Sequence, residues 1–240
     1  MWSICKKEFN QFFSNLTGYI AIILFLLING IFLFMLQDSS IFEYGYASLD
    51  KFFELAPWVL MFLVPAITMR SLSDEFKGGT FEILKTKPLS SWQIVLGKYF
   101  SVLLVMLIVI IPTFIYILTI QTLSATGTID SGGIAGSYLG LFLLAAVFAA
   151  ISLCCSSFTA NAVVAFLVSA FTCLILYFGF SAISKLPGLQ GSYDYYVEML
   201  GIDFHYHSIS RGVLDSRDLV YFASVIFLSL LITVKNLHKK

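Results

Sequence analysis

Residues 70–98 read RSLSDEFKGGTFEILKTKPLSSWQIVLGK, the only long polar stretch of the chain that carries an excess of basic residues. A hydrophobic run lies on each side of it. The best organised polar segment is therefore a loop between two apolar spans, a position in which it is suited to contact a partner outside a bilayer.

The composition places the whole chain in a membrane. Of its 240 residues, 59% are hydrophobic and 12% are charged, with a mean hydropathy of +0.91, whereas about a quarter of the residues in a soluble domain are charged. We looked for apolar runs long enough to cross a hydrocarbon core of about 30 Å. They predict six transmembrane helices, at residues 19–36, 52–69, 99–120, 134–155, 162–183 and 219–234. We therefore expect an all-α integral membrane protein with a single domain, residues 1–240.

Two of these runs need comment. The first lacks a small-residue cleavage site, so we interpret it as a retained span and not as a signal peptide. The second is interrupted by Pro57 and Pro65, and Pro65 is expected to kink the helix.

The distribution of Lys and Arg predicts the orientation. With a cytoplasmic N-terminus, the inside segments hold Lys6, Lys7, Arg70, Lys77, Lys85, Lys87, Lys98, Lys235, Lys239 and Lys240. The outside segments hold only Lys51, Lys185, Arg211 and Arg217, and most acidic residues also fall outside. We therefore expect both termini in the cytoplasm.

Residues 1–18 predict an amphipathic helix. Trp2, Cys5, Phe9, Phe12 and Leu16 recur at helical spacing, and the lysines lie on the other side. Such a helix is suited to lie in the membrane interface. The alternative is an ordinary helix that covers other helices.

Two glycines divide the polar loop. Residues 70–77 continue the second span outwards, and Gly78 and Gly79 end it, because glycine readily adopts the left-handed conformation of a helix C-terminus. Thr80 is then a suitable N-cap for a short helix, which Pro88 ends. Ser90 and Gln93 form a capping-box pattern that starts a further helix near residue 91. We expect this helix to follow the interface and turn into the third span after Lys98.

The short helix, at about residues 81–86, is the candidate docking element. Phe81, Glu82, Ile83 and Leu84 offer an aromatic, acidic and aliphatic surface to a partner. A plain connector is the alternative, although connectors are usually shorter.

The chain shows no chemistry of its own. It has no G-x-x-x-x-G-K-[ST] phosphate-binding loop. The predicted membrane interiors contain no Asp, Glu, Lys, Arg or His except Glu54 near an outer end, which argues against a proton-coupled transporter or an intramembrane metalloprotease. The four cysteines lack a zinc-ligand spacing. We expect no catalytic residue and no cofactor, so the energy must come from a partner.

His205 and His207 would chelate a metal only in an extended segment. A helix with Asp203 as N-cap and Gly212 at its end fits the sequence better, and it separates the two imidazoles by about 200° around the axis. We therefore expect no metal site.

Small residues recur in the fourth span. Gly132, Gly136 and Gly140 fall every fourth residue, and small residues let helix backbones approach closely in lipid. We favour packing within one subunit, with a dimer contact as the alternative. Asn29 in the first span is expected to bond to another helix.

The loop resembles the signature region of type-2 (exporter-type) permeases of ABC transporters. The matching residues are Arg70, Glu75, Gly79, Thr80, Glu82, Leu84, Pro88, Gly97 and Lys98. Phe81 stands where many relatives carry Leu. The resemblance implies that residues 70–98 form a cytoplasmic coupling region in which Arg70, Glu75, Gly79, Thr80, Phe81, Glu82, Leu84, Pro88 and Lys98 couple the permease to a separate ATPase subunit.

The resemblance extends beyond this loop. It implies an interfacial elbow helix at residues 1–18 and an external re-entrant segment at residues 184–218, since residues 210–213 and Asp215 fit that element. The acids and aromatics of this segment predict two short helices that form a lid, with Phe204, Ile209, Arg211 and Gly212 as candidate lid residues. A flexible external loop is the alternative.

Within the family, residues 57–98 and 207–222 look most similar to those of the gliding-motility-associated permeases. That similarity implies an exporter complex in a bacterial inner membrane, with an ABC ATPase, a second permease copy as a homodimer and an auxiliary membrane subunit, and no nucleic acid. Permeases for copper-enzyme maturation, sodium or drug export share the same loop and remain alternatives. A different class of function also remains open, a non-transport membrane anchor that transmits ATPase-driven force or signal to an envelope machine.

Overall fold

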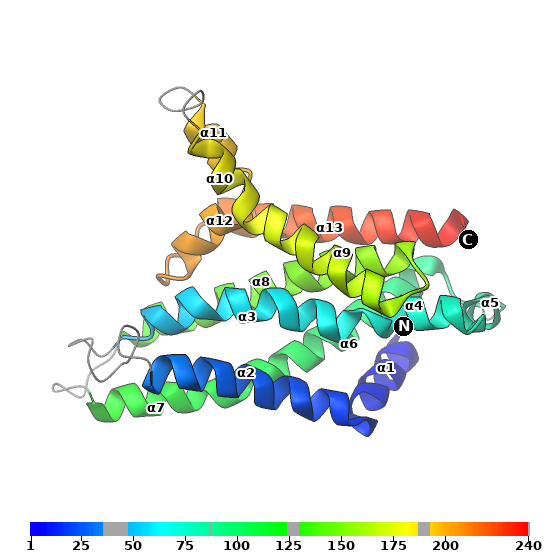
Figure 1. The fold of residues 1–240 in the computed structure, drawn as a ribbon, viewed down its shortest axis with the longest axis horizontal. Coiled ribbons are helices and arrows are strands. Elements are labelled where there is room, and N and C mark those ends of the chain that lie inside the picture. Colours follow the sequence, from blue (N-terminus) through cyan, green and yellow to red (C-terminus); the bar gives the residue numbers. More distant parts are fainter. Residues whose placement is uncertain (36–47, 87, 124–129, 187–192, 240) are drawn as a thin grey trace.

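The computed structural model describes residues 1–35, 48–86, 88–123, 130–186 and 193–239. These residues form helices, with no β-strand among them (Figure 1). The α-helices are α1 (Trp2–Ser14), α2 (Leu16–Phe34), α3 (Asp50–Thr68), α4 (Arg70–Lys77), α5 (Thr80–Lys85), α6 (Ser91–Ile110), α7 (Phe114–Leu123), α8 (Ser131–Phe158), α9 (Ala162–Leu174), α10 (Phe180–Ser184), α11 (Asp194–Glu198), α12 (Ile202–Ile209) and α13 (Ser216–Lys239). A 3₁₀ turn, η1 (Ile111–Thr113), joins α6 to α7, and a π-helix, η2 (Ile175–Gly179), joins α9 to α10.

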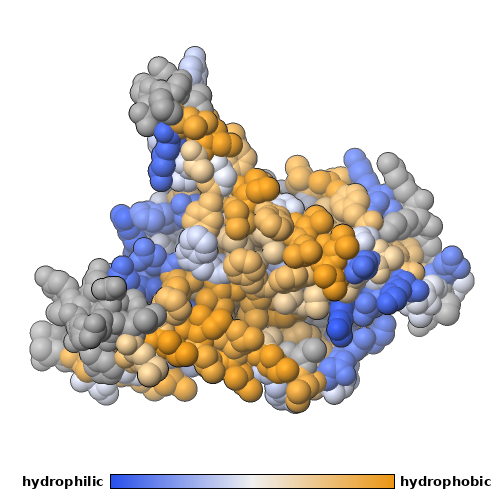
Figure 2. Space-filling view, in the orientation of Figure 1, coloured by the Kyte–Doolittle hydropathy of each residue, from blue (hydrophilic) through white to orange (hydrophobic). Residues whose placement is uncertain are grey.

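Five helical stretches are long and apolar enough to cross a membrane. They are Asp50–Lys77, Ser91–Leu123, Ser131–Phe158, Ala162–Ser184 and Ser216–His238. The first expected span falls on α2, which meets α1 at a bend of 70°, and this bent pair is a sixth candidate if it is counted as one span. Figure 2 shows the corresponding surface, an apolar belt with hydrophilic residues gathered toward its ends.

The structure bears on two expectations about the shape of the helices. α6 remains one helix from Ser91 to Ile110, so the expected turn after Lys98 is wrong and residues 91–98 are the first two turns of the span. Pro65 lies inside α3, and the helix is interrupted only at Met69, one turn later. There the Thr68 hydroxyl donates to the Val64 carbonyl at 2.9 Å.

α8 is the central helix, and it packs against α3, α6, α9 and α13. Its small residues serve packing within the subunit. A Cβ atom added to Gly136 would lie 2.8 Å from the carbonyl oxygen of Gly212, and one added to Gly140 would overlap the Ile209 side chain. Asn29 is fully buried but donates to Phe25 in its own helix at 2.8 Å, so the expected bond to another helix is wrong.

Candidate functional site

The turn between α4 and α5 follows the glycine pattern. α4 ends at Lys77, and Gly79 adopts the left-handed conformation with φ +65°. α5 begins one residue earlier than expected, with Gly79 in the N-cap position and Thr80 as its first residue. The Thr80 hydroxyl donates to the Glu75 carbonyl at 3.5 Å instead. The predicted N-cap role of Thr80 is therefore wrong.

α5 has an attached face and a free face. Phe81 is only 5% exposed, and its ring meets the edge of Phe76 on α4 with centroids 5.1 Å apart. Thr80 and Glu82 are exposed and Leu84 is half-buried. Phe81 therefore holds the short helix to α4. Among the side chains of α5 that the structure describes, those of Thr80 and Glu82 and the edge of Leu84 remain accessible. Gly79 and Pro88, at the two ends of α5, are also exposed.

A buried lysine ties this region to the N-terminal helix. The Lys98 ammonium lies 2.9 Å from Glu75 of α4 and 3.0 Å from Glu8 of α1, and it donates to the Ser71 carbonyl at 2.6 Å. The Lys98 side chain is 0% exposed, and the two carboxylates are 13% and 15% exposed. Three helices thus meet at one ammonium group. Glu75 and Lys98 stabilise this arrangement of helices from the interior of the protein and do not lie on a surface that a partner would contact.

Gly97 explains why α1 can approach so closely. A Cβ atom at this position would lie 3.0 Å from both the Ile4 Cβ and the Met1 carbonyl oxygen. Cys5, on the same helix, is buried, and burial raises the pKa of its thiol. Gly97 and Lys98, in the second turn of α6, therefore have different tasks. The glycine admits α1, and the lysine anchors it.

The start of α6 confirms the capping box. The Ser90 hydroxyl accepts from the Gln93 amide at 3.3 Å, and the Gln93 side chain accepts from the Ser90 amide at 3.2 Å. Two backbone donors at the helix start are satisfied in this way. The start of α6 is thereby fixed, with Ser90 as its N-cap.

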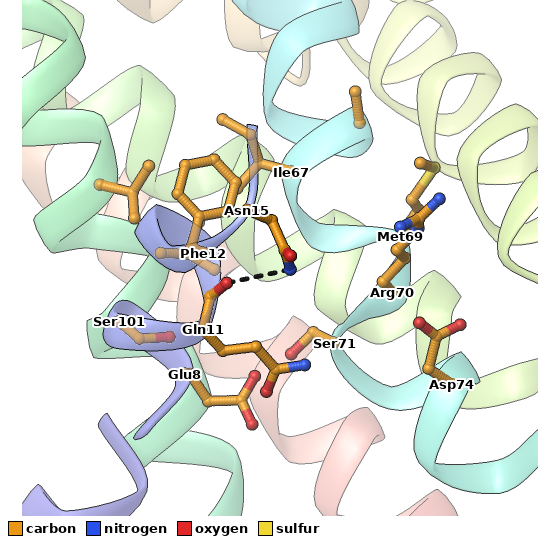
Figure 3. A pocket seen from close by; sticks show the side chains of 13 residues that line it. Glu8, Gln11, Phe12, Asn15, Ile67, Met69, Arg70, Ser71, Asp74 and Ser101 are labelled. Carbon is orange, nitrogen blue, oxygen red and sulfur yellow. Dashed lines mark hydrogen bonds between the residues drawn. The ribbon is translucent and has the colours of Figure 1, made fainter. Parts of the chain in front are cut away.

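Arg70 lies apart from α5. It is exposed at the first turn of α4 and lines a cavity of about 290 Å³ between α1, the end of α3, α4 and α6. Figure 3 shows Glu8 and Gln11 of α1 reaching toward Ser71 in this cavity. Sequence reasoning missed Glu8 and Ser71. Glu8 could have been found, because it is the only acidic residue of the predicted amphipathic helix.

The opposite end of the molecule contains the candidate lid. Two short helices, α11 and α12, occupy it, but only part of the lid set faces outward. Phe204 is half-buried, with its ring 5.7 Å from Tyr195, and Arg211 is exposed. Ile209 is fully buried against Gly140 of α8, and Gly212, with φ +82°, lies against the Gly133 backbone. These last two residues therefore pack the segment onto α8.

The histidines of α12 have separate partners. The Nδ1 of His205 lies 2.7 Å from Asp218 and its Nε2 lies 2.9 Å from the Met199 carbonyl, whereas the Nε2 of His207 lies 3.2 Å from Arg211. α12 begins at Ile202 with Gly201 in the N-cap position, so the predicted cap at Asp203 is wrong. Its C-terminus also comes earlier than expected, at Ile209, which places Arg211 in the turn after the helix.

Comparison with known proteins bears on this architecture. A family model described as "ABC-2 family transporter protein" matches residues 45–196, well over half of the chain. The chain belongs to this family. A search of curated proteins finds no match. The ABC-2 match and the apolar helices make it a multi-pass membrane permease of an ABC transporter, not itself catalytic, with an ABC ATPase as its implied partner.

The first prediction concerns Lys98 of the ABC-2 permease. Replacing Lys98 with Met leaves Glu8 and Glu75 as neighbouring, largely buried carboxylates that have lost their buried ammonium partner and keep only the exposed ammonium of Lys7. Removal of one member of a buried pair costs on the order of 3–5 kcal/mol. We expect a clearly lower Tm for the purified chain and faster proteolysis within residues 1–18.

Lys7 supplies the matched control. Its ammonium lies 3.6 Å from Glu8 and 3.7 Å from Glu75, but its side chain is 60% exposed. Because exposed pairs contribute little, Lys7→Met should leave the Tm almost unchanged. Glu8→Gln and Glu75→Gln together should restore part of the Tm lost in Lys98→Met. Equal Tm values for the two lysine variants would contradict the anchoring role.

Proposed function

We propose that this ABC-2 permease works in an exporter complex in which a separate ATPase subunit drives the spans through α5. The observation that carries the proposal is the attachment of α5, which Phe81 fixes to α4 while Glu82 stays exposed. α4 is in turn fixed to α1 and α6 through Lys98. A displacement of α5 is thus passed to three helices and not absorbed in a loop.

The mechanism is a population shift. ATP binding in the partner favours one position of α5, and the attached helices favour the matching state of the spans, inward-facing or outward-facing. The working unit is a homodimer of permeases with two ATPase subunits and an auxiliary membrane subunit. The family resemblance of residues 70–98 supports this assembly, as does the absence of Asp, Glu, Lys, Arg and His from the predicted span interiors apart from Glu54.

The free face of α5 generates the second prediction. Glu82→Lys reverses the charge at position 82, and Leu84→Asp places a carboxylate on the apolar edge of this face, so the ATPase should no longer co-purify with the permease. The permease itself should stay in the membrane, because neither Glu82 nor Leu84 is among the residues that bind the Lys98 ammonium. Membrane fractionation followed by affinity purification measures both quantities.

A chemically identical control exists at the other end of the molecule. Glu198 and Leu200 lie beside α12, and Leu200 is 57% exposed. Glu198→Lys with Leu200→Asp should leave the ATPase bound. If the α5 variant also retained the ATPase, the contact would have to be elsewhere.

The same two variants address the biological role. We assign the complex to bacterial gliding motility, on the similarity of the loop and of residues 207–222 to permeases of that group. In a gliding host, the α5 variant should stop surface movement and the control should not. Normal gliding of the α5 variant after loss of the ATPase would instead favour copper-enzyme maturation, sodium export or drug export.

The third prediction tests the location in the inner membrane with both termini in the cytoplasm. In a background without the four native cysteines, a cysteine at Ser131 should react with an impermeant thiol reagent in cells with a permeabilised outer membrane. A cysteine at Thr86 should react only after the inner membrane is broken. Labelling of Thr86 in intact inner membranes would reverse the orientation. Ser192, an equivalent outer position, lies outside the described residues.

The fourth prediction concerns the lid. We assign the lid function to α12 with Phe204 and Arg211 on its outer side and Ile209 and Gly212 as its attachment. Phe204→Ser removes the ring that contacts Tyr195, so the lid should open more often and basal ATPase activity of the complex should rise. Tyr196→Ser, at a 68% exposed position, is the control. Equal ATPase activities of both variants and the wild type would remove Phe204 from the lid.

A further inference from the structure

A second cavity lies at the end of the molecule opposite the coupling region. It has a volume of about 800 Å³ and is formed by the start of α3, the π-helix η2, and α12 with the turn that follows it. Figure 2 shows hydrophilic side chains over the start of α3 and α12. The volume falls in the range of ordinary small-molecule sites, about 300–1,000 Å³. No part of this cavity belongs to the ATPase contact.

Aromatic rings form much of the cavity wall. Trp58 of α3 and Phe178 of η2 lie with their centroids 4.3 Å apart, and Tyr177 lies 4.5 Å from Phe178. Phe53 and Tyr206 complete the wall and are both buried. The Tyr206 hydroxyl donates to the Phe53 carbonyl at 2.8 Å, so α12 is fixed to α3 on this side. The buried part of the cavity wall is therefore held together by a hydrogen bond between two helices.

Two of these rings come from the π-helix. Such one-turn insertions are rare and often occur at functional sites. Here η2 places Tyr177 and Phe178 next to each other at the cavity, with Tyr177 buried and Phe178 half-exposed. The local departure from the α-helix thus coincides with the aromatic wall.

The charges of the cavity are mainly acidic. Asp50, Glu54 and Asp203 line it together with a single strongly basic residue, Arg211. Glu54 already pairs with Lys51 at 3.1 Å, and the Arg211 guanidinium lies 3.2 Å from His207. Within the described part of the chain, Asp50 and Asp203 form no ion pair with a basic residue. Two carboxylates therefore face the cavity without a cation.

We propose that this cavity binds an organic ammonium ion. Aromatic faces attract cations through their quadrupoles, most strongly at Trp, and Asp50 and Asp203 supply full negative charges beside them. A neutral apolar ligand would make no use of these charges, and an anion would be repelled by them. The ammonium group belongs either to a soluble molecule or to the headgroup of a lipid in the adjacent leaflet.

Trp58 provides a direct optical probe. The chain contains three tryptophans, so Trp2→Phe with Trp92→Phe leaves Trp58 as the only one. The full-length chain in phosphatidylglycerol nanodiscs is titrated with choline and, as a neutral isostere, with 3,3-dimethylbutanol. Choline should change the Trp58 emission in a saturable manner, and the isostere should not. Equal responses to both compounds would overturn the proposal.

Carboxylate variants test the same point by calorimetry. Asp50→Asn, at an exposed position that is not needed for the core, and Asp203→Asn should each weaken choline binding by roughly tenfold, as expected for loss of about 1.4 kcal/mol. Asp194→Asn on α11, outside the cavity, should bind as the wild type does. Unchanged affinity in both Asp50→Asn and Asp203→Asn would also overturn the proposal.

The source of the ammonium is found by changing the lipid. In phosphatidylcholine nanodiscs, a lipid headgroup in the cavity would compete with free choline and reduce its apparent affinity several-fold. Equal affinity in both lipids identifies a soluble ammonium ion as the ligand. The titrations need no ATPase subunit, so failure here leaves the coupling proposal untouched and failure of the coupling proposal leaves this site in place.

Discussion

The ammonium of Lys98 is the contact on which the organisation of residues 70–98 depends. A buried charge is tolerated only where partners surround it, and here those partners come from α1 and α4 while the lysine comes from α6. Each helix is held in place by a group that another helix supplies. The N-terminal helix, the polar loop and the third span therefore form one mechanical unit, although nothing covalent joins them at this point.

A second buried polar contact also joins two helices, at the end of the molecule that contains α12. His205 lies between the Asp218 carboxylate and the Met199 carbonyl, and both its ring nitrogens are within hydrogen-bond distance of an oxygen. The pair holds α12 against α13. Between these two polar anchors, α8 is packed through glycine and alanine contacts that require no charge.

The sequence predicted the helix ends that are determined by neighbouring residues. The end of α4 follows from the glycine pair, and the start of α6 follows from the capping box of Ser90 and Gln93. The roles of Glu8 and Phe81 did not follow, because an amphipathic pattern identifies a buried face but not what covers it. Lys98 and Glu8 are 90 positions apart, and no local rule connects them. Thr80 and Asp203 were misplaced by one and two positions for a related reason, since glycines took the cap positions.

The two ends of the molecule are connected by one helical stretch. Residues 50–77 run from Asp50 and Trp58 in the acidic cavity to the end of α4, where Phe76 contacts Phe81 of α5. α12 is fixed to this stretch by the Tyr206–Phe53 hydrogen bond, so it cannot move independently of α3. Two sites at the ends of one helical stretch influence each other if that stretch, including its interruption at Met69, adopts two positions as a unit. By thermodynamic reciprocity, a ligand that favours one position at the cavity changes the affinity of α5 for its partner by the same factor as the partner changes the affinity for the ligand.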